Sequence, residues 1–315
     1  MPDLTSLPAR VLVTGVDGVV GGNIALELSN FCEVHGLFEQ YPVAIDGCET
    51  ARWDTGISSD LAAVVRDKAP QWVIHCGRIA ESSWSPPDPS FDAGREIAAC
   101  DALARLSRIA KFRLVVLSTD AVFAGPRMFH AESLPARAAG LLPDTARRAE
   151  ELLREVGALV VRTHVYGWSP SGRRPGVVER IWRVLTESTP EVFDEESHAT
   201  PILASDLARL LLEAYRAGLT GCYHLAGAER TSLYRFAAET AEAFGVSRRH
   251  MESSCCRRGI TETSLDCRRA RSALQRPMPS LADGLARLVR QTADGWRTRF
   301  RRAPVMKTSW QPAAA

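Results

Sequence analysis

The stretch Arg10-Val-Leu-Val-Thr-Gly-Val-Asp-Gly-Val-Val-Gly-Gly-Asn-Ile-Ala-Leu-Glu-Leu28 decides how this chain folds. Val11 to Val13 are apolar and mostly β-branched without polar alternation, which predicts a short buried strand. Gly22 to Leu28 predict the helix that follows. Between the two, Thr14 to Gly21 carry glycines at 15, 18 and 21 and predict a tight turn from strand into helix.

Spaced glycines in such a turn are typical of a dinucleotide site. The first permits the sharp turn, the second lets a pyrophosphate approach the backbone, and the third lets the helix pack close to the strand. Unpaired N–H groups at the helix N-terminus attract the phosphates. We therefore expect NAD(H) or NADP(H) here, the alternative being a purely structural turn. The turn residues expected to contact the cofactor are Thr14, Gly15, Asp17, Gly18, Val19, Val20 and Gly21.

An acidic residue marks the adenosine end of this expected site. Glu33 to Phe38 predict the second strand, and Glu39 follows it, about 20 residues after the glycines. An acid there accepts hydrogen bonds from the ribose hydroxyls and repels a 2′-phosphate, so Glu39 slightly favours NAD over NADP. The alternative is a solvated loop acid. Asp54 falls where a short third strand would end and is expected near the adenine.

Composition limits the class of protein. The 315 residues are 45% hydrophobic and 24% charged, as in ordinary globular proteins, and the formal net charge of +2 argues against a nucleic-acid partner. The eight cysteines show no CxxC pair and no Cys/His ligand spacing, which predicts free thiols and no metal. Without a signal-peptide pattern or a membrane-spanning apolar run, we expect a cytoplasmic protein with no membrane partner.

Strand and helix patterns alternate through the first half of the chain. That alternation predicts an α/β fold with a doubly wound parallel sheet and helices on both faces. Further strands are predicted at 71–76, 113–117, 159–162 and 222–225. Helices are predicted at 61–68, 95–110, 144–156, 177–185, 206–217, 233–244 and 281–299, with loops at 82–89 and 124–142 and a frayed tail from 300.

Several stretches in order resemble the extended short-chain dehydrogenase/reductases, and most closely the dTDP-4-dehydrorhamnose reductase-like members. The most specific is Leu117-Ser-Thr-Asp-Ala-Val-Phe-Ala-Gly125, which is similar to the family's STDxVFxG stretch. The others are Thr14–Gly21 (TGxxGxxG), Val73–Gly77, Val161–Gly167, Pro201 with Asp206-Leu-Ala208 (PxxxxDLA), Gly221–Gly227 (GxYHLxG) and Thr263–Asp266.

The resemblance implies a Rossmann-type fold with a small C-terminal substrate lobe. We therefore expect a dinucleotide-binding domain in 1–165, to which segments of about 198–230 return, an interleaved substrate lobe in 166–300, and a flexible tail in 301–315. It also implies NAD(P)H and a small or nucleotide-sugar-like substrate. The residues that it places at the site are Cys76, Gly77 and Ser118 near the cofactor, Ser118 and Thr119 at the substrate carbonyl, and Thr163, His164 and Tyr166 near the substrate.

One departure from the family pattern bears directly on catalysis. Counted from Glu132, the family tyrosine and lysine should fall at 142 and 146, where this chain has Leu142 and Ala146, although the helix glutamate is kept as Glu150. The family's tyrosine transfers a proton and its lysine lowers the tyrosine pKa. The family's asparagine falls near Ala99. Pro143 suits the first position of a helix, with Leu142 just outside it.

Another group would have to replace the missing proton donor. His130, His75 and His164 are candidates because histidine titrates near neutral pH, but a lone histidine is more often a packed or solvated side chain. Arg78 stands where the family has a small residue near the nicotinamide. It would either hold an anionic substrate or block the site.

Two functions follow from these observations. The first is an NAD(P)-binding, reductase-like protein that acts on a small or nucleotide-sugar-like substrate by atypical chemistry. The alternative is a catalytically silent Rossmann protein that serves as a regulatory or scaffolding subunit of a partner enzyme. A homodimer is compatible with both.

Overall fold

The computed structural model of the chain describes residues 7–55, 58–172, 175–187, 190–255 and 261–303. Its centre is a nine-stranded sheet with the order β12-β7-β6-β5-β1-β2-β4-β3-β16. The strands from β12 to β4 are parallel, whereas β3 and β16 add an antiparallel edge. Their bounds are β1 Arg10–Thr14, β2 Glu33–Phe38, β3 Val43–Ile45, β4 Cys48–Arg52, β5 Trp72–His75, β6 Arg113–Thr119, β7 Leu159–Thr163, β12 Gly221–His224 and β16 Phe300–Arg302.

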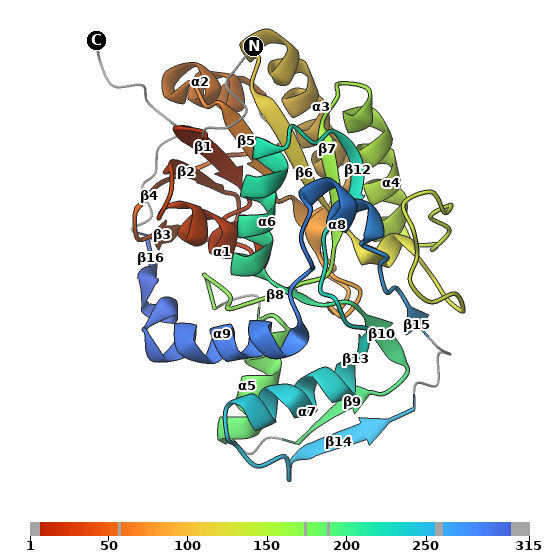
Figure 1. The fold of residues 1–315 in the computed structure, drawn as a ribbon. Helices are drawn as coiled ribbons and strands as arrows, with labels where there is room; N and C mark the ends of the chain where they lie inside the picture. Colours follow the sequence, from red (N-terminus) through yellow and green to blue (C-terminus); the bar gives the residue numbers. More distant parts are fainter. Residues whose placement is uncertain (1–6, 56–57, 173–174, 188–189, 256–260, 304–315) are drawn as a thin grey trace.

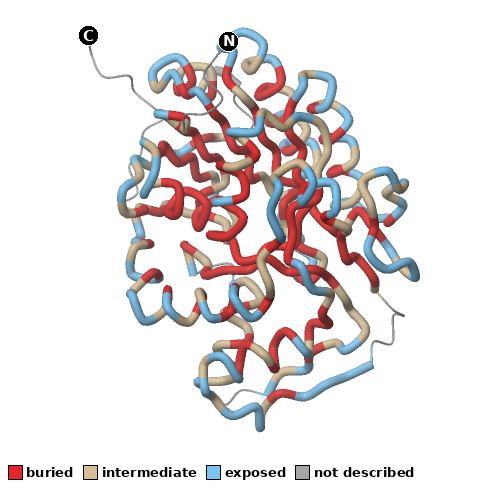
Figure 2. Tube along the Cα trace, viewed as in Figure 1, coloured by how far each residue is buried: buried red, intermediate tan, exposed pale blue. Residues whose placement is uncertain are grey.

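Helices cover both faces of this sheet (Figure 1). On one face α1 (Val19–Leu28) packs against α6 (Ala204–Arg216). On the other, α3 (Ala93–Ala110) packs between α2 (Ser58–Lys68) and α4 (Leu141–Arg154). The strands between the helix layers are buried along most of their length, as the red segments of Figure 2 show. This architecture confirms the predicted α/β fold class.

A smaller lobe follows the sheet at the lower end of Figure 1. Its helices α5 and α7 pack against each other, and β14 runs parallel to β9. The elements of this part are β8 Val165–Tyr166, α5 Val177–Glu187, β9 Glu191–Asp194, β10 Ser197–Ala199, β11 Ile202–Leu203, β13 Thr231–Ser232, α7 Leu233–Ala243, β14 Met251–Ser254 and β15 Thr261–Glu262. The next helix, α8 Arg268–Leu274, packs against β12 of the large sheet.

Two sequence predictions about the C-terminal region are wrong. The helix predicted for 281–299 ends early: α9 spans Leu281–Ala293, Gly295 turns the chain at φ +72°, and a 3₁₀ helix, η3, covers Trp296–Arg299. The tail does not begin frayed either, because Phe300–Arg302 form β16 beside β3. Residues 304–315 lie outside the described residues.

The start of α4 also differs from the prediction. The helix begins at Leu141, directly after Gly140, whose φ of +135° is a backbone conformation that favours glycine. Leu142 is therefore inside the helix and Pro143 is its third residue. The proline is tolerated there because the first N–H groups of a helix have no partner within it.

Candidate active site

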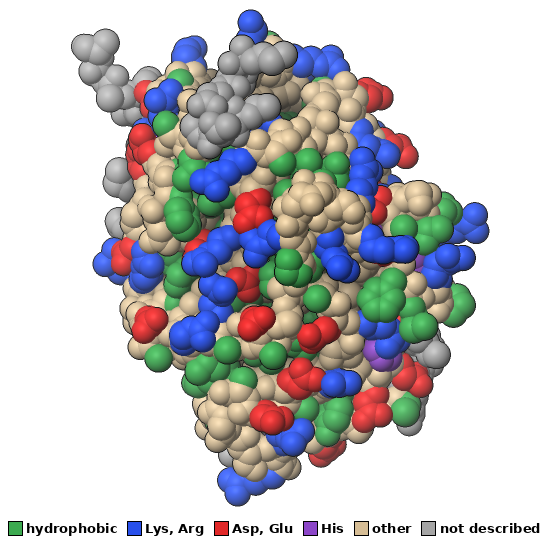
Figure 3. All heavy atoms as spheres, viewed as in Figure 1, with side chains coloured by type: hydrophobic (Ala, Val, Ile, Leu, Met, Phe, Trp, Pro, Cys, Tyr) green, Lys and Arg blue, Asp and Glu red, His purple; other side chains and the backbone are tan. Residues whose placement is uncertain are grey.

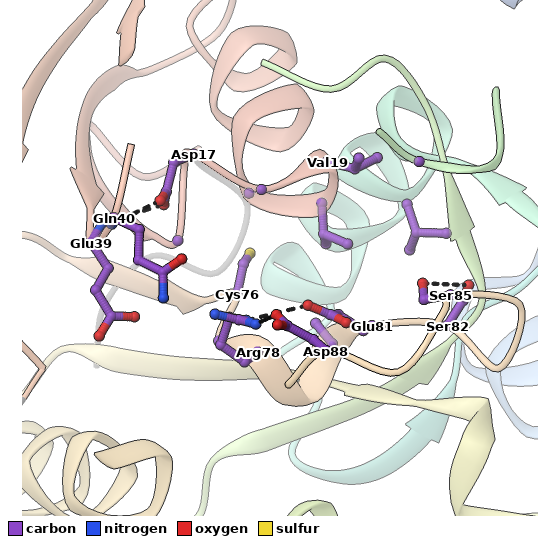
Figure 4. A pocket seen from close by; sticks show the side chains of 18 of the residues that line it. Asp17, Val19, Glu39, Gln40, Cys76, Arg78, Glu81, Ser82, Ser85 and Asp88 are labelled. Atoms are coloured by element: carbon purple, nitrogen blue, oxygen red, sulfur yellow. Dashed lines mark hydrogen bonds and ion pairs between the residues drawn. The ribbon is translucent and has the colours of Figure 1, made fainter. Parts of the chain in front are cut away.

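A pocket of about 440 Å³ lies at the carboxyl ends of β1, β2 and β5. The glycine turn forms one wall, and the chain after β5 forms another (Figure 4). The smaller lobe closes the pocket with β8 and the start of α5. The predicted residues that line it are Thr14, Gly15, Asp17, Gly18, Val19, Val20, Gly21, Glu39, His75, Cys76, Gly77, Arg78 and Tyr166.

Backbone geometry explains the glycines of the turn. Gly15 has φ +69°, and a Cβ there would lie 1.9 Å from the backbone oxygen of Cys76. A Cβ on Gly21 would lie 2.3 Å from the oxygen of Gly15. Gly18 precedes α1 without a side-chain cap, so the first N–H groups of the helix are open to an anion.

Glu39 faces the pocket at the end of β2 (Figure 4). Its carboxylate accepts a hydrogen bond of 2.6 Å from Thr55 and lies 3.2 Å from Nη2 of Arg95. Asp54 is paired with the same Arg95 at 2.5 Å and does not line the pocket, although its neighbours Trp53 and Thr55 do. The structure therefore brings Glu39, but not Asp54, into the pocket wall.

Beneath Gly77, His75 and Glu96 form a buried pair. The His75 Nε2 atom lies 3.2 Å from Glu96 Oε1, and Nδ1 lies 2.7 Å from the hydroxyl of Thr14. A Cβ on Gly77 would be 1.9 Å from Glu96 Oε1, so this glycine permits the close approach. Burial raises the pKa of the Cys76 thiol, which makes Cys76 an apolar part of the wall.

The side chains of His75, Glu96 and Cys100 bring ligand-type atoms within 4.8 Å of one another, a group that cysteine spacing did not suggest. Hydrogen bonds already engage two of them, because Glu96 also accepts the backbone N–H of Arg78 at 3.0 Å. Burial, and then the charge of Glu96, raise the pKa of the Cys100 thiol far above its usual range. Hydrogen bonding and packing explain why these three side chains lie close together.

Arg78 lines the pocket with its charge already paired. Its guanidinium contacts the carboxylate of Asp88 and lies 3.2 Å from that of Glu81 (Figure 4). These contacts hold the two ends of the loop 78–89 together. Pro86, Pro87 and Pro89 of this loop complete the wall of the pocket. An anion would have to compete with two carboxylates for the arginine.

The hydroxyls at the end of β6 are turned away from the pocket. Ser118 is fully buried and donates to Glu150 at 2.6 Å, and Glu150 is also paired with Arg162. Thr119 is fully buried and donates to the backbone oxygen of Glu81 at 2.5 Å. Neither residue lines the pocket.

A buried network beside them joins the two lobes. The Asp120 carboxylate lies 2.8 Å from His164 Nδ1 and accepts hydrogen bonds from the hydroxyls of Ser83 and Thr263 at 2.6 and 2.5 Å. Burial opposes ionisation of Asp120, but the charge of His164 and these hydrogen bonds together lower its pKa. His164 thus serves as the partner of Asp120 and does not line the pocket.

The remaining predicted residues lie away from the pocket. His130 stacks on Phe123 with ring centroids 4.4 Å apart, and burial lowers its pKa. The Thr163 hydroxyl is buried, without a hydrogen-bond partner among the described atoms. Ala146 and Ala99 are fully buried. Of the two positions expected for the dyad, neither Leu142 nor Ala146 lines the pocket.

Other lining residues were missed by the sequence analysis. Trp53 and Trp84 line the pocket, and Arg180 and Arg183 reach it from α5. Arg180 is paired with Glu191 at 2.6 Å. In the sequence α5 is an ordinary amphipathic helix, and only the packing of the two lobes shows that these arginines line the same pocket as the glycine turn.

Among the described residues, none of the helices has both the length and the apolar character needed to cross a bilayer. On the face drawn in Figure 3, basic and acidic side chains are interspersed.

Comparisons with known proteins agree with this architecture. The dTDP-4-dehydrorhamnose reductase of Bacillus anthracis in complex with NADP is similar in fold, with a TM-score of 0.72 and 18% identity over 90% of this chain and 99% of that one. The UDP-glucose 4-epimerase of Thermotoga maritima with UDP-glucose has a TM-score of 0.75 and 18% identity over 91% and 99%.

Among curated proteins, methionine adenosyltransferase 2 subunit beta of Xenopus tropicalis is 23% identical over 264 residues, which are 79% of this chain and 76% of the relative. The sequence profile described as "RmlD substrate binding domain" matches residues 9–294. This match covers most of the sequence, including the glycine turn and the smaller lobe, and the chain therefore belongs to the RmlD substrate binding domain family.

Proposed function

We propose that this protein binds NAD(H) or NADP(H) at the glycine turn, with NAD favoured, and does not carry out the family's reductase step. In this role it is a catalytically silent subunit that regulates or scaffolds a partner enzyme. Two observations support the missing reductase step. At the end of β6, the side chains of Ser118 and Thr119 are buried and hydrogen-bonded to Glu150 and Glu81. In α4, Leu142 and Ala146 stand where a tyrosine and a lysine are expected. General acid–base help of this kind contributes about 10²–10⁴-fold to a rate.

Cofactor binding is supported by the turn itself. Gly15 and Gly21 allow the tight turn and its close packing, Gly18 leaves room for a pyrophosphate, and Glu39 faces the pocket where a ribose would lie. The similar reductase of Bacillus anthracis is in complex with NADP, and the Bordetella bronchiseptica enzyme WbmH, also similar in fold, with NAD⁺.

The first test is a calorimetric titration of the purified chain with NADH and with NADPH, after any bound cofactor has been removed. Gly18→Asp should abolish binding, because its carboxylate would meet the pyrophosphate. Gly18→Asn is the matched control of equal size, and both residues are good N-caps that preserve the helix start. Wild-type affinity of both the Asp and the Asn variant for NADH would exclude the pyrophosphate from this turn.

The partner enzyme is inferred from a sequence relative. The similarity to methionine adenosyltransferase 2 subunit beta supports a subunit role, with a methionine adenosyltransferase catalytic chain as the partner to try first. Light scattering of the two purified chains, with and without NADH, tests this. A particle of the summed mass supports it, and two separate species at micromolar concentration contradict that partner.

A second function is favoured by one pair in the pocket wall. His75 and Glu96 both line the pocket, and a histidine paired with a carboxylate can move a proton. In this alternative, an atypical enzyme acts on a small or nucleotide-sugar-like substrate whose phosphates meet Arg183. Turnover of nucleotide sugars by the wild-type chain, lost in His75→Gln while NADH affinity persists, would favour it over the silent subunit.

A further inference from the structure

We propose that the carboxylate of Asp17 excludes the 2′-phosphate of NADP, because it fills the backbone N–H donors that would otherwise neutralise that phosphate. The inference rests on the proposed dinucleotide site and adds a specificity residue inside the glycine turn. Glu39 is then one of two acids that select NAD.

Three successive backbone N–H groups point at Asp17. Its Oδ1 atom accepts from the N–H of Glu39 at 3.3 Å, and its Oδ2 atom accepts from Gln40 at 3.0 Å and Tyr41 at 3.1 Å. Figure 4 shows the side chain directed at this corner after β2. Successive N–H groups that converge in this way form an anion-binding nest, and here the anion is part of the chain.

The nest lies at the ribose end of the pocket. Asp17, Glu39 and Gln40 all line the pocket, and Asp17 is only 8% exposed. A ribose that bonds Glu39 therefore sits beside the N–H groups that Asp17 occupies. A 2′-phosphate in that place would meet a carboxylate where it needs donors.

Nearby charges strengthen the effect. The guanidinium of Arg95 lies at this corner and is paired with Glu39 at 3.2 Å and with Asp54 at 2.5 Å. In the contacts described, three carboxylates, those of Asp17, Glu39 and Asp54, accompany the single guanidinium of Arg95, which leaves an excess of negative charge. The 2′-hydroxyl of NAD can donate a hydrogen bond to a carboxylate, whereas a phosphate of nearly two negative charges is repelled.

The experiment measures the affinities of NADH and NADPH for the wild type, Asp17→Asn and Asp54→Asn by calorimetry. AMP and 2′,5′-ADP serve as a second probe pair that differs only in the 2′-phosphate. Each variant removes one carboxylate charge, but only Asp17→Asn alters the nest. We expect NADPH to gain about tenfold on NADH in Asp17→Asn, and less than about threefold in Asp54→Asn.

Separate outcomes overturn the two proposals. If the wild type binds neither dinucleotide, both the proposed function and this inference are wrong. If wild type binds NADH but Asp17→Asn leaves the NADPH/NADH ratio unchanged, only the inference fails. An equal gain in Asp54→Asn also overturns it, because general charge would then suffice.

A second variant at the same position keeps the test usable if Asp17→Asn does not fold. Asp17→Ser keeps an oxygen acceptor near the nest, removes the charge and shortens the side chain. It should shift the ratio in the same direction, and its NADH affinity and thermal midpoint report whether the turn is intact. A wild type that binds NADPH as tightly as NADH contradicts the inference without any variant.

Discussion

The hydroxyl of Thr119 donates a 2.5 Å hydrogen bond to the backbone oxygen of Glu81, across the gap between β6 and the loop after β5. The same oxygen atom of Thr119 accepts the N–H of Ala121 at 3.0 Å. A side chain that the family resemblance places at the substrate carbonyl thus donates its hydroxyl hydrogen to the protein's own backbone.

Thr119→Val should therefore lower stability without changing cofactor affinity. The variant leaves the backbone oxygen of Glu81 and the backbone N–H of Ala121, both in half-buried residues, without their partner, which costs about 1–3 kcal/mol. Urea unfolding and NADH titration measure the two effects, with the exposed Thr186→Val as control. A variant of unchanged stability and weakened NADH binding would instead place the hydroxyl in the cofactor site.

The glycines of the turn should differ sharply in tolerance. Gly15→Ala combines φ +69° with a Cβ 1.9 Å from a backbone oxygen, so we expect a loss of more than about 3 kcal/mol or no folded protein. Gly18→Ala meets its nearest atom at 3.4 Å and has an ordinary φ of −92°, so it should fold. Thermal unfolding of both variants checks this, and equal tolerance would contradict the close packing of the turn on Cys76.

Glu39→Ser should improve NADPH binding relative to NADH. The substitution removes a carboxylate from the ribose end and releases Arg95, which then has only Asp54 as an acidic partner among the contacts described. We expect a relative gain of about tenfold, which corresponds to the loss of one repulsive contact. Competition between the two cofactors measures it, and an unchanged preference would make Glu39 a solvated acid.

The sequence was sufficient for the framework of the fold. The apolar run before Gly15 and the alternation after it predict β1, α1 and the parallel sheet, because burial on both faces leaves a simple periodic signature. It was insufficient where chain ends depend on tertiary pairing: β16 forms only because Phe300–Arg302 find the edge of β3, which no local pattern shows.

The sequence predicted the residues of the glycine turn at the site better than the other site residues. Local motifs place Thr14–Gly21 and Gly77 at the pocket, since the strand–turn–helix unit that holds them is contiguous. Which way Ser118 and His164 turn depends on partners far along the chain, namely Glu150 and Asp120. The approach of Arg180 and Arg183 likewise depends on how the smaller lobe packs.

The stability of the folded chain should fall as the pH drops below about 6.5, in part because of His224. Burial, and then the charge of Arg162, lower the pKa of His224 to about 3. The unfolded chain takes up a proton at this histidine near pH 6.5, whereas the folded chain does not until near pH 3. Protonation therefore favours unfolding within that window, by up to about 1.4 kcal/mol per pH unit.

Urea unfolding of the wild type and His224→Asn between pH 7 and pH 4.5 measures this contribution. The variant should lose stability at pH 7, where its side chain packs less well against the ring of Phe123, and should show a shallower decline with acid. His250→Asn, at a histidine that is not fully buried, should keep the wild-type slope. Parallel declines in wild type and His224→Asn would mean that His224 is protonated in the folded chain, and that burial beside Arg162 does not hold it neutral.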